Sequence, residues 1–390
     1  MSQNLRGKYA IVGAGQSPLG NVPELGDVGL SVVAAKNAIE DAGLNKSDID
    51  GLITRGPDDV YCHHQRVGQA LGMNATFSTS TDNGGASQVL GVIMACMAID
   101  AGLCKNVVVA FGRDTWSRTH RDAAAKRMVN NAVVHAREFG PEFGQFGAPV
   151  NYAIAARRHM QLYGTRKEHL GAISIAFRNH AMKNPAAFFR KPLTMEEYLN
   201  ARLIVEPFCL FDCSIFVDGG GAVVVTSAER ARDLKKPPAY VLGFGVGNRL
   251  TGWFAEENMI TTGAKEAGET AYRMAGIGPD DVDTAQIYDC FTHMVLLQLE
   301  DYGFCKKGEG GPFAASGALE FGGALPTNTS GGQLSEGHVE GMLQIVEGVR
   351  QVRRDYGPDR QVKDAEIALV TGHGGNTVCQ SALILGRQAA

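Results

Sequence analysis

The chain has 390 residues, of which 44% are hydrophobic and 20% charged, with 49 glycines, as is typical of soluble α/β proteins. The formal net charge is −4 and the basic residues are dispersed, which excludes the basic surface that binds nucleic acid or anionic lipid. The N-terminus has no secretory signal pattern and no apolar run could span a bilayer, so we expect a cytoplasmic protein without a membrane span.

The first part of the chain alternates short apolar runs with amphipathic stretches. Strands are predicted at "YAIVGAG", "GLITRG" and "NVVVAFGRD", and helices at Val28 to Ala42 and Gly84 to Asp100. This βαβαβ order favours parallel strands covered by helices. The run "VDGGGAVVVTSAERA" from Val217 predicts a buried strand near the close of this half.

A segment from Thr115 to Glu206 lies outside this alternation and is rich in Arg, Asn and aromatic residues. We expect an inserted region that covers one face of the first half, because α/β proteins build substrate sites on loops at strand ends. A plain helical elaboration is the alternative.

The same unit is used twice in the chain. The run "AIEDAGLNKSDIDGLI" from Ala38 is similar to "AYRMAGIGPDDVDTAQI" from Ala271, and each follows a glycine-punctuated strand. Each is then followed by a Gly-Gly helix and another strand, and four elements in the same order indicate an internal repeat. The sequence therefore predicts two homologous halves, residues 1–235 with the insertion at 115–206, and residues 236–390.

Cofactor and metal motifs are missing from the sequence. Gly13 and Gly15 resemble part of a dinucleotide fingerprint, but the third glycine is displaced, and "GHGGNT" lacks the length and Lys of a P-loop. Cys209 and Cys213 have no partner at zinc-site spacing, and the eight cysteines are predicted to be reduced and mostly buried. We expect no bound cofactor and no metal.

The two Gly-Gly helices would meet at the centre of a duplicated fold. Their N-termini carry unpaired backbone N–H groups and partial positive charge, which stabilise an oxyanion or enolate. Gly84 and Gly85 in the first half, and Gly331 and Gly332 in the second, would let a substrate approach the backbone. Two tight strand-to-helix turns would need the same glycines.

The second half adds side chains that can move protons. Tyr288 and Asp289 follow a predicted strand in "QIYDCFTHM", and His373 ends the last predicted strand in "TGHGG". The block "SGGQLSEGHVEGM" supplies Glu336, His338 and Glu340. Because strand ends converge in α/β folds, we expect Tyr288, His338 and His373 to face one cavity, where imidazole and phenol suit proton transfer. Buried structural histidines are the alternative.

The duplicated architecture, with "YDCFT", "NTSGGQLSEGHVEGM" and "LVTGHGG", resembles the thiolase superfamily over essentially the whole chain. The match is closest to its sterol-carrier-protein-2-type and lipid-transfer-protein-type branch. The resemblance implies a five-layer αβαβα fold. It also implies a catalytic Cys at the first Gly-Gly helix, an activating His in a Gly-His-Pro motif, and a second Cys near the C-terminus.

Carried over to this sequence, those positions are only partly retained. His338 fits the activating histidine, although Val339 replaces Pro, and Tyr288 fits the strand-end position that holds water or the oxyanion. The nucleophile position falls at Gly84, and the second Cys position falls near His373. Cys379 lies several residues later and is expected to be a core residue of a following helix. Ser87 is the alternative nucleophile or a substrate-binding residue, and Asp289 is a further candidate for substrate binding.

The loss of both thiols argues against acyl transfer through a thioester, which needs a nucleophile. The resemblance implies instead a retro-aldolase acting on a steroid-like or otherwise branched 3-hydroxyacyl-CoA, in which CoA is only part of the substrate. Tyr288 would be base or proton shuttle, His338 a base or an oxyanion donor, and Gly84, Gly85 and Gly332 backbone supports. The aldolases of this branch imply a homodimer and a small DUF35 partner with zinc-ribbon and OB-fold parts. A Tyr stands in them where this chain has His338. A Claisen-type acyltransferase and a non-catalytic acyl-CoA or lipid-binding subunit are the alternatives.

Overall fold

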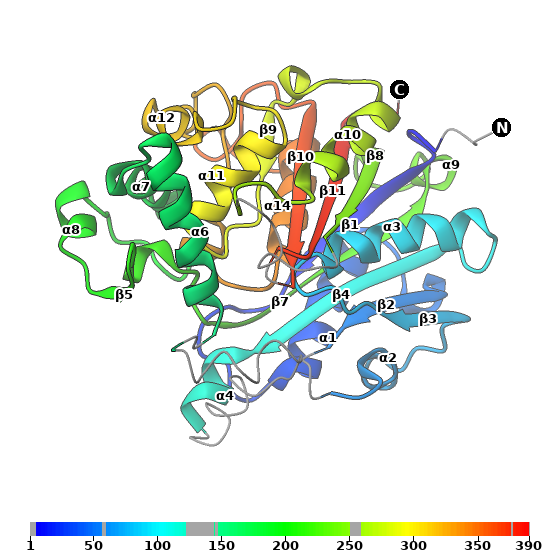
Figure 1. Ribbon diagram of the computed structural model, residues 1–390. Helices are drawn as coiled ribbons and strands as arrows, with labels where there is room; N and C mark the ends of the chain where they lie inside the picture. Colours follow the sequence, from blue (N-terminus) through cyan, green and yellow to red (C-terminus); the bar gives the residue numbers. More distant parts are fainter. Residues whose placement is uncertain are drawn as a thin grey trace.

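A computed structural model describes residues 5–56, 60–121, 144, 147–249, 259–375 and 377–389. Its core is one nine-stranded sheet in the order β3-β2-β4-β7-β1-β8-β11-β10-β9 (Figure 1). The first-half strands are β1 (Tyr9–Gln16), β2 (Gly51–Arg55), β3 (Phe77–Ser80), β4 (Asn106–Asp114) and β7 (Asp218–Ser227). The second-half strands are β8 (Ala239–Asn248), β9 (Thr284–Gln286), β10 (Ile367–Gly374) and β11 (Cys379–Gly386).

The strand order repeats about the β1/β8 pair at the centre of the sheet. Reading outward, β1-β7-β4-β2 in one direction corresponds to β8-β11-β10-β9 in the other. The counterpart of β3 is reduced to a single parallel bridge between Ala285 and Thr327. The predicted duplication therefore appears directly in the topology.

Helices cover both faces of this sheet. In the first half they are α1 (Gly26–Asp41), α2 (His63–Leu71), α3 (Ser87–Asp100) and α9 (Ala228–Ala231). In the second half they are α10 (Ala264–Ala275), α11 (Thr292–Asp301), α12 (Gly310–Ala315), α13 (Gly332–Ser335) and α14 (Met342–Arg353). Buried residues of α3 and α14 share one apolar core with strands of both halves, whereas α1 and α10 pack on the outer faces. With α3 and α14 between the strands of the two halves and α1 and α10 outside them, the elements follow the predicted αβαβα order.

Three local predictions were wrong. Only β2 with β3 and β4, and β9 with β10, pair in parallel, because β7 and β11 enter the sheet antiparallel. Cys379 begins strand β11 and not a helix, so His373 ends the penultimate strand. The second Gly-Gly helix is split into α13 and α14 because Glu340 and Gly341 between them have left-handed φ values of +44° and +84°.

Most of the described insertion packs on the second half, whereas α4 (Thr115–Arg121) stays on the first half, where the N–H of Ser117 donates to Asp218 of β7. The insertion also contains α6 (Ala148–Tyr163), α7 (Lys167–Lys183), α8 (Met195–Leu199) and β5 (Leu203–Val205), and β5 pairs with β6 (Phe208–Cys209) just after it. Most of 122–146 lies outside the described residues. The amide of Asn184 donates to the carbonyl of Ser330, and His159 on α6 bonds Glu300 on α11. Buried apolar residues of α7 fill the same core as α11.

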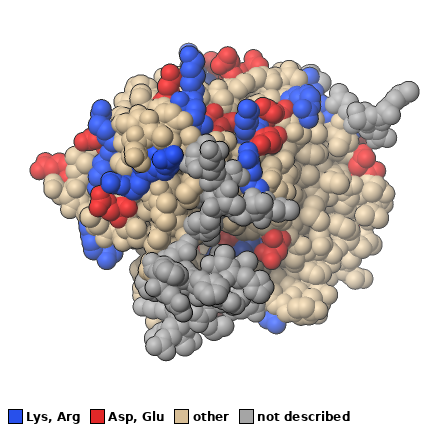
Figure 2. Space-filling model, viewed as in Figure 1, with Lys and Arg blue, Asp and Glu red and all other residues tan. Residues whose placement is uncertain are grey.

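The surface seen in Figure 2 carries charges of both signs. Lys and Arg lie among Asp and Glu on the face shown in Figure 2. Among the helices that the structure describes, none has the length and apolar character to cross a bilayer.

Candidate active site

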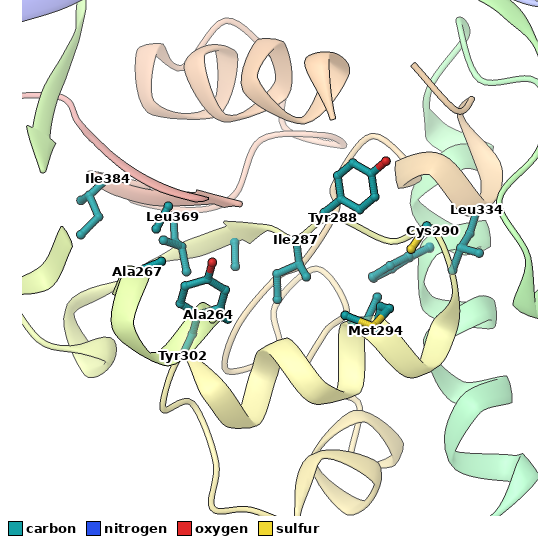
Figure 3. Close-up of a cluster of buried hydrophobic side chains, with 14 of the residues drawn as sticks. Ala264, Ala267, Ile287, Tyr288, Cys290, Met294, Tyr302, Leu334, Leu369 and Ile384 are labelled. Carbon is teal, nitrogen blue, oxygen red and sulfur yellow. The ribbon is translucent and has the colours of Figure 1, made fainter. Parts of the chain in front are cut away.

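Tyr288 follows β9 at the carboxyl end of the strand. Its backbone is fixed from both sides, because its N–H donates to Oγ1 of Thr371 (2.9 Å) and its carbonyl accepts from Nε2 of Gln298 (2.7 Å). The side chain is 4% exposed. Figure 3 shows its hydroxyl pointing away from the apolar side chains of Ile287 and Met294. The fold therefore buries the ring and aims the phenol out of the apolar cluster.

His338 lies in the break between α13 and α14 and meets Tyr288 there. Its Nε2 is 3.3 Å from the Tyr288 hydroxyl, and its Nδ1 is 3.4 Å from Oγ of Ser214. The His338 N–H donates to the carbonyl of Ile215, which fixes the histidine to the segment before β7. The structure thus brings the predicted Tyr288 and His338 together, and adds Ser214, which no sequence motif marked.

Both members of this pair are uncharged at neutral pH. Burial, and then the positive charges of Arg113 and Arg55, lower the pKa of His338 to about 3. Burial raises the pKa of Tyr288 far above its ordinary value, an effect that the same two arginines partly oppose. A neutral phenol and a neutral imidazole in contact can pass a proton between a substrate oxygen and each other.

His373 forms a wall of the site beside Tyr288. The centroids of the two rings are 5.7 Å apart. Both ring nitrogens of His373 have partners, because Nε2 lies 2.5 Å from the hydroxyl of Tyr152 on α6 and Nδ1 contacts Nε2 of Gln380. Burial lowers the pKa of His373 to about 4. The insertion therefore reaches the site through Tyr152, which sequence reasoning missed, as it missed Gln380.

The turn before α3 leaves room for the phenol. A Cβ atom at Gly85 would lie 2.2 Å from the hydroxyl of Tyr288, whereas a Cβ at Gly84 would lie 3.0 Å from Cα of Gly374. A side chain at position 85, and not at 84, would point at Tyr288. The position at which a thiol would face the site is therefore Gly85, one residue after the predicted one. A side chain there and the Tyr288 phenol exclude each other.

Ser87 holds the same turn together. Its Oγ accepts the N–H of Asn83 (2.7 Å), its own N–H donates to the carbonyl of Gly84 (3.0 Å), and the residue is fully buried. These hydrogen bonds tie Ser87 to the turn, which argues against a role as a nucleophile or a substrate-binding hydroxyl.

Asp289 points away from the phenol into the start of α13. Its carboxylate accepts the N–H groups of Gln333 (2.9 Å) and Leu334 (3.1 Å) and the amide of Gln344 (2.9 Å). Burial raises the pKa of Asp289 to about 7 although these donors favour its ionised form. The N-terminus of α13, which we expected to stabilise an oxyanion, is therefore occupied by Asp289.

Gly332 is required by this cap. Its φ is +58°, and a Cβ atom there would lie 2.2 Å from Oδ2 of Asp289. Gly332 thus makes room for the Asp289 carboxylate.

Glu336 and Glu340, the two glutamates on either side of His338, make structural contacts. Glu336 accepts from Oγ of Ser330 (2.6 Å) and Nδ2 of Asn184 (3.0 Å), and burial raises its pKa to about 7. Glu340 forms ion pairs with Arg55 and Arg113. No group of three or more His, Cys, Asp or Glu side chains within the described ranges is arranged to hold a metal ion.

The fold and this site define a thiolase-type protein in which a phenol lies next to His338. Residues 247–387 match the family model described as thiolase C-terminal domain-like. Over 98% of its length the chain is 38% identical to a steroid side-chain-cleaving aldolase of Thermomonospora curvata, covering 98% of that protein. It is 37% identical to the 17-hydroxy-3-oxo-4-pregnene-20-carboxyl-CoA lyase of Mycobacterium tuberculosis, over 98% of this chain and 100% of that one.

A solved structure shows the same relationship. The Ltp2-ChsH2(DUF35) aldolase superposes with a TM-score of 0.87 at 36% identity, over 98% of both chains. The chain belongs to the thiolase superfamily, in its branch of lipid-transfer-protein-type aldolases. It is a carbon–carbon lyase of the retro-aldol type.

Proposed function

We propose that the chain cleaves the Cα–Cβ bond of a 3-hydroxyacyl-CoA thioester with a steroid-like or otherwise branched β-substituent. The products are a ketone or aldehyde and a shortened acyl-CoA. The contact between Tyr288 and His338 beside a glycine at position 85 carries this proposal, since it provides proton transfer where a thiolase has a nucleophile. The names of the two curated relatives support the substrate class.

The reaction needs no covalent intermediate. The Tyr288–His338 pair takes the proton of the β-hydroxyl, the Cα–Cβ bond breaks, and its electron pair passes into the thioester enolate. Cα then accepts a proton, so that atoms and charge balance over the cycle. We assign His373 a supporting role, in which its ring holds the side of the site next to the phenol. The turn at Gly84 and Gly85 has a second role, in which its backbone approaches the thioester oxygen.

The chemistry of the thiols argues against acyl transfer. Burial raises the pKa of Cys290 and of Cys379, so both thiols are protonated and poor nucleophiles. Ser87 is buried in its turn. A Claisen-type acyltransferase therefore has no activated group among these residues.

The quaternary structure forms a second part of the proposal. We assign this chain a small DUF35 partner, on the evidence of the Ltp2-ChsH2(DUF35) aldolase, and the cytoplasm as its compartment. A homodimer fits the edge of the sheet, because among the described strands β3 pairs only with β2 and offers its other side to a second strand. Light scattering of the chain with and without the partner measures both associations.

The Tyr288→Phe variant tests the site directly. It keeps the ring packing and removes the hydroxyl, so cleavage of a steroid-side-chain 3-hydroxyacyl-CoA by the chain with its DUF35 partner should fall at least 100-fold. Binding of the CoA thioester should be unchanged. Tyr272→Phe is the matched control, since it removes a buried hydroxyl of α10 that donates to the carbonyl of Tyr302. Full turnover by Tyr288→Phe would remove the phenol from the reaction.

A further inference from the structure

Three charged residues stand beside the Tyr288–His338 pair. Arg55 ends β2, Arg113 lies near the end of β4, and Glu340 lies in the break before α14. Nη1 of Arg55 is 2.8 Å from Oε2 of Glu340, and Nη1 of Arg113 contacts Oε1. The side chains of Arg55 and Glu340 are 7% and 6% exposed, and that of Arg113 is 27% exposed. We call them the Arg55–Glu340–Arg113 cluster.

The residue that follows Glu340 in the sequence lies next to the ring of Tyr288. Gly341 follows Glu340, and a Cβ atom at Gly341 would lie 3.1 Å from Cδ2 of Tyr288 and 3.3 Å from the carbonyl oxygen of Gly85. Glu340 itself has a φ of +44°, a conformation that costs free energy for any residue other than glycine. The two ion pairs hold the glutamate in this conformation, so the cluster is built at the site rather than placed on a free surface.

The cluster adds two positive charges and one negative charge to this edge of the site. Among the described residues, Asp289, Cys290, His373 and Tyr152 are further ionisable side chains near Tyr288. Burial raises the pKa of both Asp289 and Cys290, which favours their uncharged forms. The guanidinium groups of Arg55 and Arg113 thus place positive charge beside Tyr288 and His338, with one excess positive charge over Glu340.

A nearby positive charge affects the two candidate bases in opposite ways. It stabilises a phenolate and destabilises an imidazolium, because the first becomes negative when it acts as a base and the second becomes positive. Both arginines lower the pKa of Tyr288 and of His338. The same charges thus promote tyrosine as a base and oppose histidine as one.

From this geometry we propose that Arg55 and Arg113, held by Glu340, are positioning residues that make Tyr288 the base and His338 its neutral hydrogen-bond donor. This inference rests on the proposed retro-aldol reaction. The Tyr288 phenolate takes the proton of the β-hydroxyl while Cα–Cβ breaks, and the phenol then returns a proton to Cα of the enolate. His338 donates through Nε2 to the phenolate and accepts through Nδ1 from Ser214, and stays uncharged throughout.

Arg113→Gln and Arg113→Lys separate charge from packing. In the wild type, kcat/KM should rise with pH between pH 6.5 and 9.5, because the small phenolate fraction grows. In Arg113→Gln this curve should move by about one unit to higher pH, so that kcat at pH 7.5 falls about tenfold with KM within about threefold of the wild type. Arg113→Lys should restore most of the activity. Arg354→Gln is the control, since it breaks an exposed ion pair with Glu366.

The opposite result has a distinct signature. If His338 is the base, Arg113→Gln makes the imidazole easier to protonate. The acidic limb of the pH–rate curve then moves to higher pH, and the rate at pH 8.5 is unchanged. That pattern, or a loss that Arg113→Lys does not restore, would overturn the inference.

A measurement without turnover completes the test. With [13Cε1]histidine labelling, the His338 signal, assigned through His338→Asn, should move toward imidazolium at higher pH in Arg113→Gln than in the wild type. An unchanged His338 signal contradicts the inference alone. Full activity of Tyr288→Phe contradicts the proposed function instead, so the two failures are distinguishable.

Discussion

At the residue scale, side chains at positions 85 and 288 compete for the same space. The phenol of Tyr288 lies where a side chain at position 85 would project, and Gly85 alone leaves that space open. Glycine at position 85 thus leaves the room into which the phenol reaches, next to His338.

Gly85→Ala should therefore remove activity without unfolding the protein. A single methyl group would meet the Tyr288 hydroxyl at 2.2 Å, so the ring must shift away from His338, and overpacking of this kind costs about 1–3 kcal/mol. We expect kcat/KM to fall at least 100-fold with the far-UV circular dichroism spectrum unchanged. Gly357→Ala is the control, because nothing lies within 4 Å of its Cβ position. Activity of Gly85→Ala near that of the control would show that the phenol does not occupy this space.

Sequence reasoning found the residues that lie in motifs and missed those that reach the site from elsewhere. Tyr288 and His338 sit in glycine-rich blocks that carry the family pattern. Ser214, Tyr152 and Arg113 come from segments without such a pattern, and tertiary packing brings them to His338, His373 and Glu340, respectively. Hydrogen bonds over more than 100 positions in the chain leave no local signal in a single sequence.

At the scale of elements, the break between α13 and α14 positions His338. The sequence predicts one helix after Gly331 and Gly332, because apolar periodicity gives no sign of two consecutive residues with left-handed backbone angles. The structure ends α13 after one turn and caps its start with Asp289. A helix of four residues makes few bonds of its own, so its position depends on that cap.

Asp289→Ala tests the cap. The substitution leaves two buried N–H groups of α13 and the amide of Gln344 without their acceptor, so the free energy of unfolding should fall by about 2–4 kcal/mol. Denaturant unfolding measures this loss. Asp48→Ala removes an exposed cap on the N–H of Asn45 and should cost no more than about 1 kcal/mol. Equal losses in the two variants would contradict the assigned role of Asp289.

At the scale of the whole molecule, the duplication could be predicted and the docking of the insertion could not. The repeat is visible because two units keep the same order of elements, and the sheet preserves it as β1-β7-β4-β2 and β8-β11-β10-β9. Amphipathic helices show that a face is buried, but not against which surface. The described insertion packs on α11 and α13, and through Tyr152 it contributes to the wall of the site in the opposite half.

The central claim is that this fold cleaves a carbon–carbon bond without a nucleophile. The most direct test is to incubate the chain and its DUF35 partner with a steroid-side-chain 3-hydroxyacyl-CoA in the absence of free CoA, and to follow products and intact protein by mass spectrometry. We expect the carbonyl product and the shortened acyl-CoA in equal amounts, with the protein mass unchanged. Cleavage that requires added CoA, or a trapped acyl-enzyme, would contradict it.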